Sequence, residues 1–343
     1  MDFKYSKIID PIKYETQGLC GEIPLRMHNY PQNEDIGTVR CQRDWHHLVS
    51  PLKGYKGGLH AKWNFMSVSV PECLPERLEI ISYANEFAFL YDDKTEDFNK
   101  DQLDIANDTM QEAFLEGATT GSISEKRPNG LKKMQAIILQ EMMAIDEERA
   151  MTTMKAWVEF LKFAGGRQHD KHFATLEEFI PYRSIDVGKW FWYGVITFGM
   201  AITIPPAEID KMEELMMPAW AAAALQNDIF SWEKERDAAQ RYGKKEVVNA
   251  VFVLMGEHSI GEQEALAKLR KITMAYVDEY VEIVERVMEN QTLSKELLRY
   301  MEAILYSLSG NAVWSISCPR YNPTEVYNKS QLALMKGEYM SRF

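Results

Sequence analysis

The feature that most constrains the fold of this chain is a succession of helical apolar patterns that runs from Pro75 almost to the last residue. Between Glu76 and Tyr91, apolar residues recur at spacings of three and four, which is the period of one helical face. Further helical stretches are predicted at residues 101–117, 131–164, 187–203, 206–238, 245–256, 261–290 and 294–317. Since no segment shows strand alternation or an internal repeat, the pattern predicts one all-α domain.

The two ends of the chain differ from this helical middle. Turn signals cluster in residues 1–75, where we expect loops and short helices that pack on the bundle, with one possible helix at residues 35–49. Residues 76–330 are predicted to form the helical core. Residues 331–343 are predicted to form a C-terminal tail or the start of a linker.

Charge and cysteine content argue against several classes of protein. With 39 Lys and Arg against 51 Asp and Glu, the net charge of −12 disfavours nonspecific binding to nucleic acid or to an anionic membrane. The four cysteines form no CxxC pair, which disfavours a zinc ribbon or disulfide scaffold and favours a reducing compartment. No apolar stretch reaches the ~18 residues of a membrane span, and we therefore expect a soluble, cytoplasmic protein.

Two of the predicted helices are apolar on nearly all sides, a pattern typical of central, buried helices. They cover residues 190–204 and 215–230. The second continues directly into the polar and acidic residues that follow Gln226. A buried helix that ends in polar groups predicts a deep pocket with a polar rim.

An aspartate-rich segment, DDKTED at residues 92–97, ends the helix that begins at Glu76. Asp92 and Glu96 are one turn apart, and Asp93 is rotated from Asp92 by about 100°. Carboxylates at a helix C-terminus repel one another and the helix dipole, and bound cations would relieve that repulsion. Asp92, Asp93 and Glu96 are therefore candidate metal ligands, although a solvated acidic loop has the same pattern.

A second polar group lies on one helical face further along the chain. Asn227, Ser231 and Glu235 follow one another at i, i+4 and i+8, and their amide, hydroxyl and carboxylate oxygens suit Mg²⁺. Trp220, seven residues before Asn227, lies on the same face. The alternative is an ordinary amphipathic face, but a polar face that continues into an aromatic one favours a metal site above an apolar pocket.

Together these two segments resemble the two metal-binding motifs of class I terpene cyclases, in the family's order. The resemblance extends from about Pro75 to Tyr321. Arg183 lies 44 residues before Asn227, where the family carries its diphosphate-sensing arginine, and Arg320-Tyr321 resembles the family's C-terminal Arg-Tyr pair. The chain departs from the family's DDxxD motif in having Glu96 at its last position.

The sequence also resembles a narrower group, the N-terminal cyclase domains of fungal bifunctional terpene synthases of the fusicoccadiene-synthase type. The stretches GLCGEIPLR and PECLPER and the length of 343 residues carry this resemblance. In that group a prenyltransferase domain follows and supplies the substrate. The resemblance therefore implies that such a domain of the same natural polypeptide is a partner of this chain.

The family resemblance implies a class I terpenoid synthase helical bundle around a deep apolar cavity. It further implies that the protein ionises an isoprenoid diphosphate with the help of three Mg²⁺ ions, releases the diphosphate and cyclises the carbocation. The implied substrate is geranylgeranyl diphosphate, which would give a polycyclic diterpene. The implied metal ligands are Asp92, Asp93, Glu96, Asn227, Ser231 and Glu235. The implied diphosphate-binding residues are Arg183, Lys234, Arg320 and Tyr321. The residues expected to contact the reacting carbocation are Phe89 and Trp220, with Phe65, Trp190 and Trp314 in second rank.

Three functions remain open from the sequence. The first is cyclisation of geranylgeranyl diphosphate or of its C25 homologue, geranylfarnesyl diphosphate. The second is a prenyl-chain elongase on the same helical fold, but that class carries a second aspartate-rich motif where this chain has NDIFS at residues 227–231. The third is a noncatalytic helical binding protein, for which Mg²⁺ would not raise the melting temperature. The oligomeric state stays open.

Overall fold

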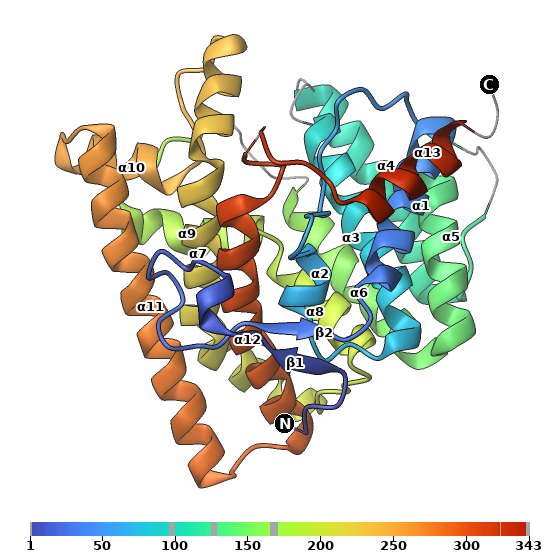
Figure 1. The fold of residues 1–343 in the computed structure, drawn as a ribbon, viewed down its shortest axis with the longest axis horizontal. Helices are drawn as coiled ribbons and strands as arrows, with labels where there is room; N and C mark the ends of the chain where they lie inside the picture. The colour runs from blue at the N-terminus through green and yellow to red at the C-terminus, as the bar shows by residue number, and fades with distance from the viewer. Residues whose placement is uncertain (1, 96–99, 125–128, 165–170, 323, 341–343) are drawn as a thin grey trace.

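The computed structural model describes residues 2–95, 100–124, 129–164, 171–322 and 324–340. Within these ranges nearly all regular structure is helical (Figure 1), and the predicted all-α class is confirmed. The helices are α1 (Gln32–Leu48), α2 (Phe65–Ser69), α3 (Pro75–Thr95), α4 (Lys100–Thr120), α5 (Gly130–Ile145), α6 (Glu147–Ala164), α7 (Leu176–Asp186), α8 (Lys189–Gly199), α9 (Ile209–Arg241), α10 (Ala250–His258), α11 (Glu262–Asn290), α12 (Lys295–Ser317) and α13 (Lys329–Met340).

The N-terminal segment contains a small sheet that the sequence pattern did not predict. Strand β1 (Ser6–Ile8) pairs antiparallel with β2 (Arg26–His28), so that Ser6 lies opposite His28. Three-residue strands are too short to show alternation, which explains the miss. Two short 3₁₀ helices, η1 (Pro11–Lys13) and η2 (Pro206–Glu208), complete the described elements.

The predicted long helix over residues 131–164 is wrong, because the chain breaks between α5 and α6 at Asp146. The backbone there is extended, with φ −158° and ψ 92°. Its carboxylate accepts hydrogen bonds from the backbone N–H of Arg149 and from the guanidinium of Arg77. These bonds satisfy a backbone N–H in the first turn of α6 and the buried guanidinium of Arg77. Their stabilisation of the break outweighs the helical apolar pattern, which continues through it.

The two helices predicted to be central are buried as expected. In α8, every residue from Tyr193 to Gly199 is buried, and in α9 burial is nearly continuous from Pro218 to Trp232. Helix α9 packs against α7, α11 and α12, whereas α8 packs against α6 and α3. Residues of α3, α8, α9 and α12 line the cavity described below, so these helices surround it.

The two ends of the chain pack on this bundle. Helix α2 lies against α12, and α13 lies beside α1, although these two helices come from opposite ends of the chain (Figure 1). Helix α13 covers most of the segment expected to be a tail or linker, while the predicted domain boundaries themselves stay predictions. Among the described residues, no helix combines the length and the hydropathy that crossing a membrane requires.

Candidate active site

One cavity of about 230 Å³ brings together side chains from both predicted metal-binding segments. Asp92 from α3 and Asn227 from α9 line the same cavity, although they are far apart in the chain. Below them the wall is largely aromatic. The aromatic lining residues are Phe65, Phe87, Phe89, Tyr91, Phe114, Trp157, Phe160, Phe191, Trp192, Trp220, Trp314 and Tyr321. The geometry is therefore a polar mouth above an apolar interior, as the sequence predicted.

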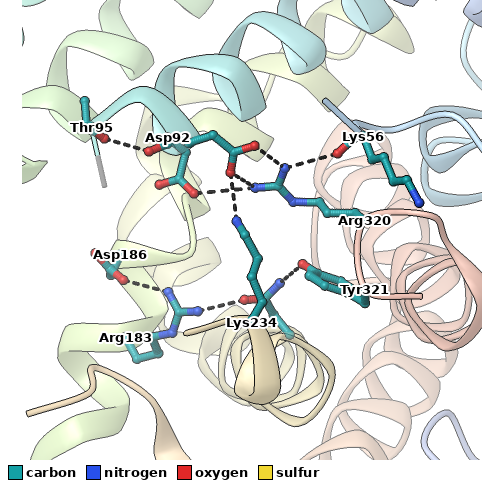
Figure 2. A network of polar contacts seen from close by, with 10 residues as sticks. Lys56, Asp92, Thr95, Arg183, Asp186, Lys234, Arg320 and Tyr321 are labelled. Carbon is teal, nitrogen blue, oxygen red and sulfur yellow. Dashed lines mark hydrogen bonds and ion pairs between the residues drawn. The ribbon is translucent and has the colours of Figure 1, made fainter. Parts of the chain in front are cut away.

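Arg183 is the centre of a buried network on one side of this mouth (Figure 2). Its Nε donates to Asp228 Oδ1 at 2.8 Å, and its Nη1 to Asp186 Oδ2 at 2.6 Å. Its Nη2 donates to Asn227 Oδ1 at 2.7 Å. Burial alone would lower the pKa of Arg183, but the two carboxylates outweigh it and raise the pKa well above its usual value. Arg183 is thus a fixed cation that touches the second motif.

Asp228 lies next to Asn227 but points away from the mouth. It is fully buried, and its second carboxylate oxygen accepts from the backbone N–H of Ala250 at 2.7 Å. Burial raises the pKa of Asp228 to about 7, against the opposing effect of Arg183. Asp228 therefore connects Arg183 to the start of α10.

On the opposite side of the mouth, Arg320 and Lys234 (labelled in Figure 2) form ion pairs with Asp93. Arg320 donates from Nη1 to Asp93 Oδ2 at 2.9 Å and from Nη2 to Asp93 Oδ1 at 2.7 Å, a bidentate pair. Lys234 Nζ donates to Asp93 Oδ1 at 2.8 Å. Asp92 is 3.8 Å from Arg320 Nη2. Three segments of the chain, α3, α9 and the turn after α12, therefore meet at the aspartate-rich helix end.

The three predicted ligands on α9 face the cavity together. Asn227 Nδ2 donates to the hydroxyl of Tyr321 at 2.9 Å, which leaves its oxygen directed at Arg183. Ser231 Oγ is buried and has no hydrogen-bond partner among the described residues. Glu235 Oε2 accepts from Asn249 Nδ2 at 2.9 Å.

This donor set fits a hard divalent cation. An orphaned buried hydroxyl beside an amide oxygen and a carboxylate is the kind of oxygen-only set that Mg²⁺ takes. Within the described part of the chain, no cluster of three or more His, Cys, Asp or Glu side chains is arranged to hold a metal. A divalent ion here would therefore depend on the amide and hydroxyl oxygens as well as on carboxylates.

The predicted aromatic residues form one packed wall. The ring centroids of Phe65 and Trp314 are 4.4 Å apart, and Phe89 stacks on Trp314 at 5.8 Å. Trp220 lines the cavity from α9. Trp190, another second-rank candidate, packs instead against Tyr193. The structure thus brings both first-rank residues and two of the three second-rank residues, Phe65 and Trp314, to the cavity, while Glu96 lies outside the described residues.

The turn between α7 and α8 and two polar residues, Asp228 and Asn249, complete the site. Val187 and Gly188 separate α7 from α8, and Gly188 has φ +97°, in the left-handed region that glycine favours. Asp228 and Asn249 were missed. Asn249 precedes the apolar run of α10 and is its N-cap, so helix-start signals could have singled it out, but not its bond to Glu235.

Comparison with known sequences places these motifs in a family. Residues 83–279 match the family described as "Terpene synthase family 2, C-terminal metal binding". Fusicoccadiene synthase of Phomopsis amygdali is 47% identical over 341 residues, 98% of this chain and 47% of that protein. "Bifunctional type I diterpene synthase tndC" of Aspergillus flavipes is 46% identical over 336 residues, 98% of this chain and 44% of that protein.

A third relative, "Bifunctional sesterterpene synthase" of Aspergillus aculeatus, is 43% identical over 336 residues, 98% of this chain and 47% of that protein. The chain thus spans about half the length of these curated relatives. Among solved structures, aristolochene synthase from Penicillium roqueforti shares the fold, with a TM-score of 0.68 at 20% identity over 85% of this chain and 96% of that one. From its matched metal-binding region and its relatives along nearly its whole length, this chain belongs to the class I terpene synthases.

Proposed function

We propose that this chain is a Mg²⁺-dependent terpene cyclase that ionises geranylgeranyl diphosphate and cyclises the carbocation to a polycyclic diterpene, with release of diphosphate. The observation that carries the proposal is the cavity, in which Asp92 from α3 and Asn227, Ser231 and Glu235 from α9 face one another above an aromatic wall. The name of the relative from Aspergillus flavipes, a diterpene synthase, supports a C20 substrate.

The proposed metal ligands are the oxygen donors on the two sides of the mouth. Asn227, Ser231 and Glu235 would hold Mg²⁺ from α9, and Asp92, Asp93 and Glu96 would hold it from the opposite side, with three ions in total. When bound, Mg²⁺ neutralises the leaving diphosphate and so lowers the barrier to ionisation. Asp93 contacts Arg320 and Lys234 in this structure, and it would exchange these cations for metal.

The proposed diphosphate-binding residues are the donors around the same mouth. Arg183, Lys234, Arg320 and Tyr321 all line the cavity. A protein with a net charge of −12 cannot hold a diphosphate by its overall field, so these local donors must do so. Arg183 and Arg320 are buried and ion-paired, and they would bind without a large loss of side-chain freedom.

The aromatic wall would steady the carbocation once the diphosphate has left. Phe65, Phe89, Trp220 and Trp314 line the cavity, and one cation–π contact contributes about 0.5–2 kcal/mol, more where water is excluded. The small Ala223 beside Trp220 leaves space for the hydrocarbon. The wall also offers no nucleophilic side chain among these four rings, which protects the cation from early capture.

The proposal also covers a further domain of the natural polypeptide and the location of the protein in the cell. The relatives called bifunctional are about twice as long as this chain, which supports a prenyltransferase domain of the same natural polypeptide as the source of substrate. We also propose a cytoplasmic location. All four cysteines are free and buried, which agrees with a reducing compartment.

A C25 substrate is the second candidate. It is favoured by the relative from Aspergillus aculeatus, whose name is that of a sesterterpene synthase. In that case geranylfarnesyl diphosphate would enter the same cavity and use the same donors at the mouth.

One experiment tests these alternatives together. The purified chain is incubated with Mg²⁺ and with C15, C20 or C25 isoprenoid diphosphate, and the extract is analysed by gas chromatography and mass spectrometry. We expect a cyclic C20 hydrocarbon that disappears with EDTA and in Asp92→Asn. A C25 hydrocarbon alone would show that the substrate is geranylfarnesyl diphosphate rather than geranylgeranyl diphosphate. Products that keep their diphosphate would indicate an elongase, and no hydrocarbon from any substrate would reject the proposal.

A further inference from the structure

The amide of Gln331, in the first turn of α13, is fully buried where the chain was expected to leave the fold. Its Nε2 donates to Asp35 Oδ1 at 2.8 Å and lies 3.0 Å from two further acceptors, the backbone oxygen of His60 and Asn64 Oδ1. Its Oε1 accepts from the backbone N–H of Asn328 at 3.0 Å. A buried amide with every polar atom satisfied is a specific anchor rather than a chance contact.

Two of the acceptors of Gln331, those of His60 and Asn64, belong to the segment that leads into α2. Asn64 is the residue directly before α2, and its side chain also donates to Asp35 at 2.7 Å and accepts from the backbone N–H of His60 at 2.9 Å. All three of these residues are buried. Gln331 therefore fastens residues 60–64 to α1 through Asp35.

This segment carries part of the aromatic wall. Phe65 follows Asn64 directly, and its backbone N–H donates to the carbonyl of Gly58 at 3.1 Å. The same Gly58 carbonyl accepts from the indole Nε1 of Trp314 at 2.9 Å. Phe65 and Trp314 thus share one backbone acceptor, and both line the cavity.

A second anchor holds the other end of the segment. The carboxylate of Glu86, on α3, accepts from the backbone N–H of Gly58 at 2.9 Å and from Gln42 Nε2 at 2.6 Å. A Cβ atom on Gly57 would overlap this carboxylate, so the close approach requires glycine there. Since Glu86 fixes residue 58, the freedom that remains lies between residues 59 and 64, where Gln331 binds.

We propose that Gln331 is a positioning residue for the cyclisation cavity: from α13 it holds the segment 58–65 so that Phe65 packs on Trp314. This inference rests on the proposed function, because its consequence is a change in which hydrocarbon forms. A shift of Phe65 alters the cavity wall at the reacting carbons without touching the donors at the mouth. Product proportions should therefore change while the requirement for Mg²⁺ stays the same.

The test compares Gln331→Met, which keeps the side-chain volume but cannot donate, with Leu332→Ala, a neighbouring exposed position on α13. Hydrogen exchange of the amides at residues 58–66 is measured first, because it does not depend on activity. We expect exchange roughly tenfold faster in Gln331→Met and unchanged in Leu332→Ala. Unchanged exchange in Gln331→Met would overturn the inference.

Product proportions supply the second readout. In Gln331→Met we expect the ratio of major to minor hydrocarbons to change by about twofold or more, and this change should vanish in a Phe65→Leu background if Gln331 acts through Phe65. An unchanged ratio, or the same change in both backgrounds, would overturn the inference. A wild-type chain that makes no hydrocarbon would instead reject the proposed function, and the exchange measurement would still decide whether Gln331 holds the segment.

Discussion

At the scale of single residues, the described part of the site contains oxygen atoms whose hydrogen-bonding capacity the protein does not fill. Ser231 Oγ is the clearest, because it is buried, faces the cavity and has no hydrogen-bond partner among the described residues. The sequence predicted Ser231 from its spacing to Asn227 and Glu235. It could not predict Asp228 or Asn249 as parts of the network, because their bonds to Arg183 and Glu235 join segments that the spacing of residues does not relate.

Replacement of Ser231 by alanine tests its assignment as a metal ligand. We expect the ligand-free protein to keep its melting temperature, because the lost hydroxyl makes no bond that the fold needs. The rise in melting temperature on addition of Mg²⁺ and pyrophosphate should shrink, with apparent Mg²⁺ affinity falling by roughly 10-fold or more.

Ser69→Ala is the matched control for this prediction. Ser69 Oγ is also buried without a partner, but Ser69 is on α2 and is not among the residues that line the cavity. An equal loss of the Mg²⁺-dependent stabilisation in both variants would contradict the assignment of Ser231.

At the scale of elements, the helical period predicted most of the helices but not where they break. Asp146 divides one predicted helix because its carboxylate satisfies Arg77 and the start of α6. Helix α7 was missed because Pro181 lies inside it, and proline is disfavoured in a helix interior. The Thr175 cap and the packing of α7 on α9 outweigh that preference. Both outcomes depend on distant partners that a local pattern does not contain.

Asn249 joins one element, α10, to the proposed metal site. Its Oδ1 accepts from the backbone N–H of Val251 and so caps α10, while its Nδ2 donates to Glu235. Asn249→Ser should keep the cap but lose the Nδ2 bonds to Glu235 and to the backbone oxygen of Asp228. We therefore expect a weaker Mg²⁺-dependent rise in melting temperature, with a smaller loss of stability than in a variant that also loses the cap.

Asn249→Ala separates the two roles further. It should lose the two Nδ2 bonds and the cap, and loss of the cap should lower the free energy of unfolding by about 1 kcal/mol more than in Asn249→Ser. Chemical denaturation and thermal shift with Mg²⁺ and pyrophosphate measure the two effects. A normal Mg²⁺ response in Asn249→Ser would show that Glu235 needs no such partner.

The short helix α2 provides a pH-dependent prediction. Glu34 accepts from the backbone N–H groups of Met66 and Ser67 at the start of α2, and burial raises the pKa of Glu34 from 4.5 to about 8. The folded state thus binds the proton more tightly than the unfolded state does. Its contribution to stability is complete below the unfolded pKa and is lost as pH rises through the folded value.

The measurement is the free energy of unfolding between pH 5 and about 8. We expect it to fall with rising pH in the wild type and to fall less steeply in Glu34→Gln, which cannot ionise. The exposed Glu22→Gln should keep the wild-type slope. Equal slopes in the wild type and Glu34→Gln would contradict the raised pKa.

At the scale of the whole molecule, the mouth of the cavity is closed by ion pairs between segments that are distant in the chain. Asp93 belongs to α3, Lys234 to α9, and Arg320 to the turn after α12. The sequence predicted that the two motifs would converge across one cavity. It did not predict that Arg320 and Lys234 would be paired with Asp93, because that requires knowing how three helix ends meet.

Asp93→Asn should destabilise the ligand-free protein, because it leaves the nearly buried Arg320 without its bidentate partner. Asp93 is itself partly exposed, so we expect a loss of about 1–3 kcal/mol in the free energy of unfolding rather than the full effect of a buried pair. Urea denaturation measures this loss. The surface pair of Arg236 with Asp237 supplies the control, and Asp237→Asn should change stability by less than about 0.5 kcal/mol.

From the pairing of Asp93 with Arg320 and Lys234, we also expect the mouth to select among anions. An anion that reaches the mouth does not meet two bare cations, because it must compete with a carboxylate that belongs to the protein and is held at a fixed place. A singly charged ion such as chloride would attract Arg320 and Lys234 less strongly than the carboxylate of Asp93, which is already in contact with them. In the proposed function a diphosphate, which brings several charges at once, would displace Asp93, and we expect the entrance to select anions by the number of charges that they carry.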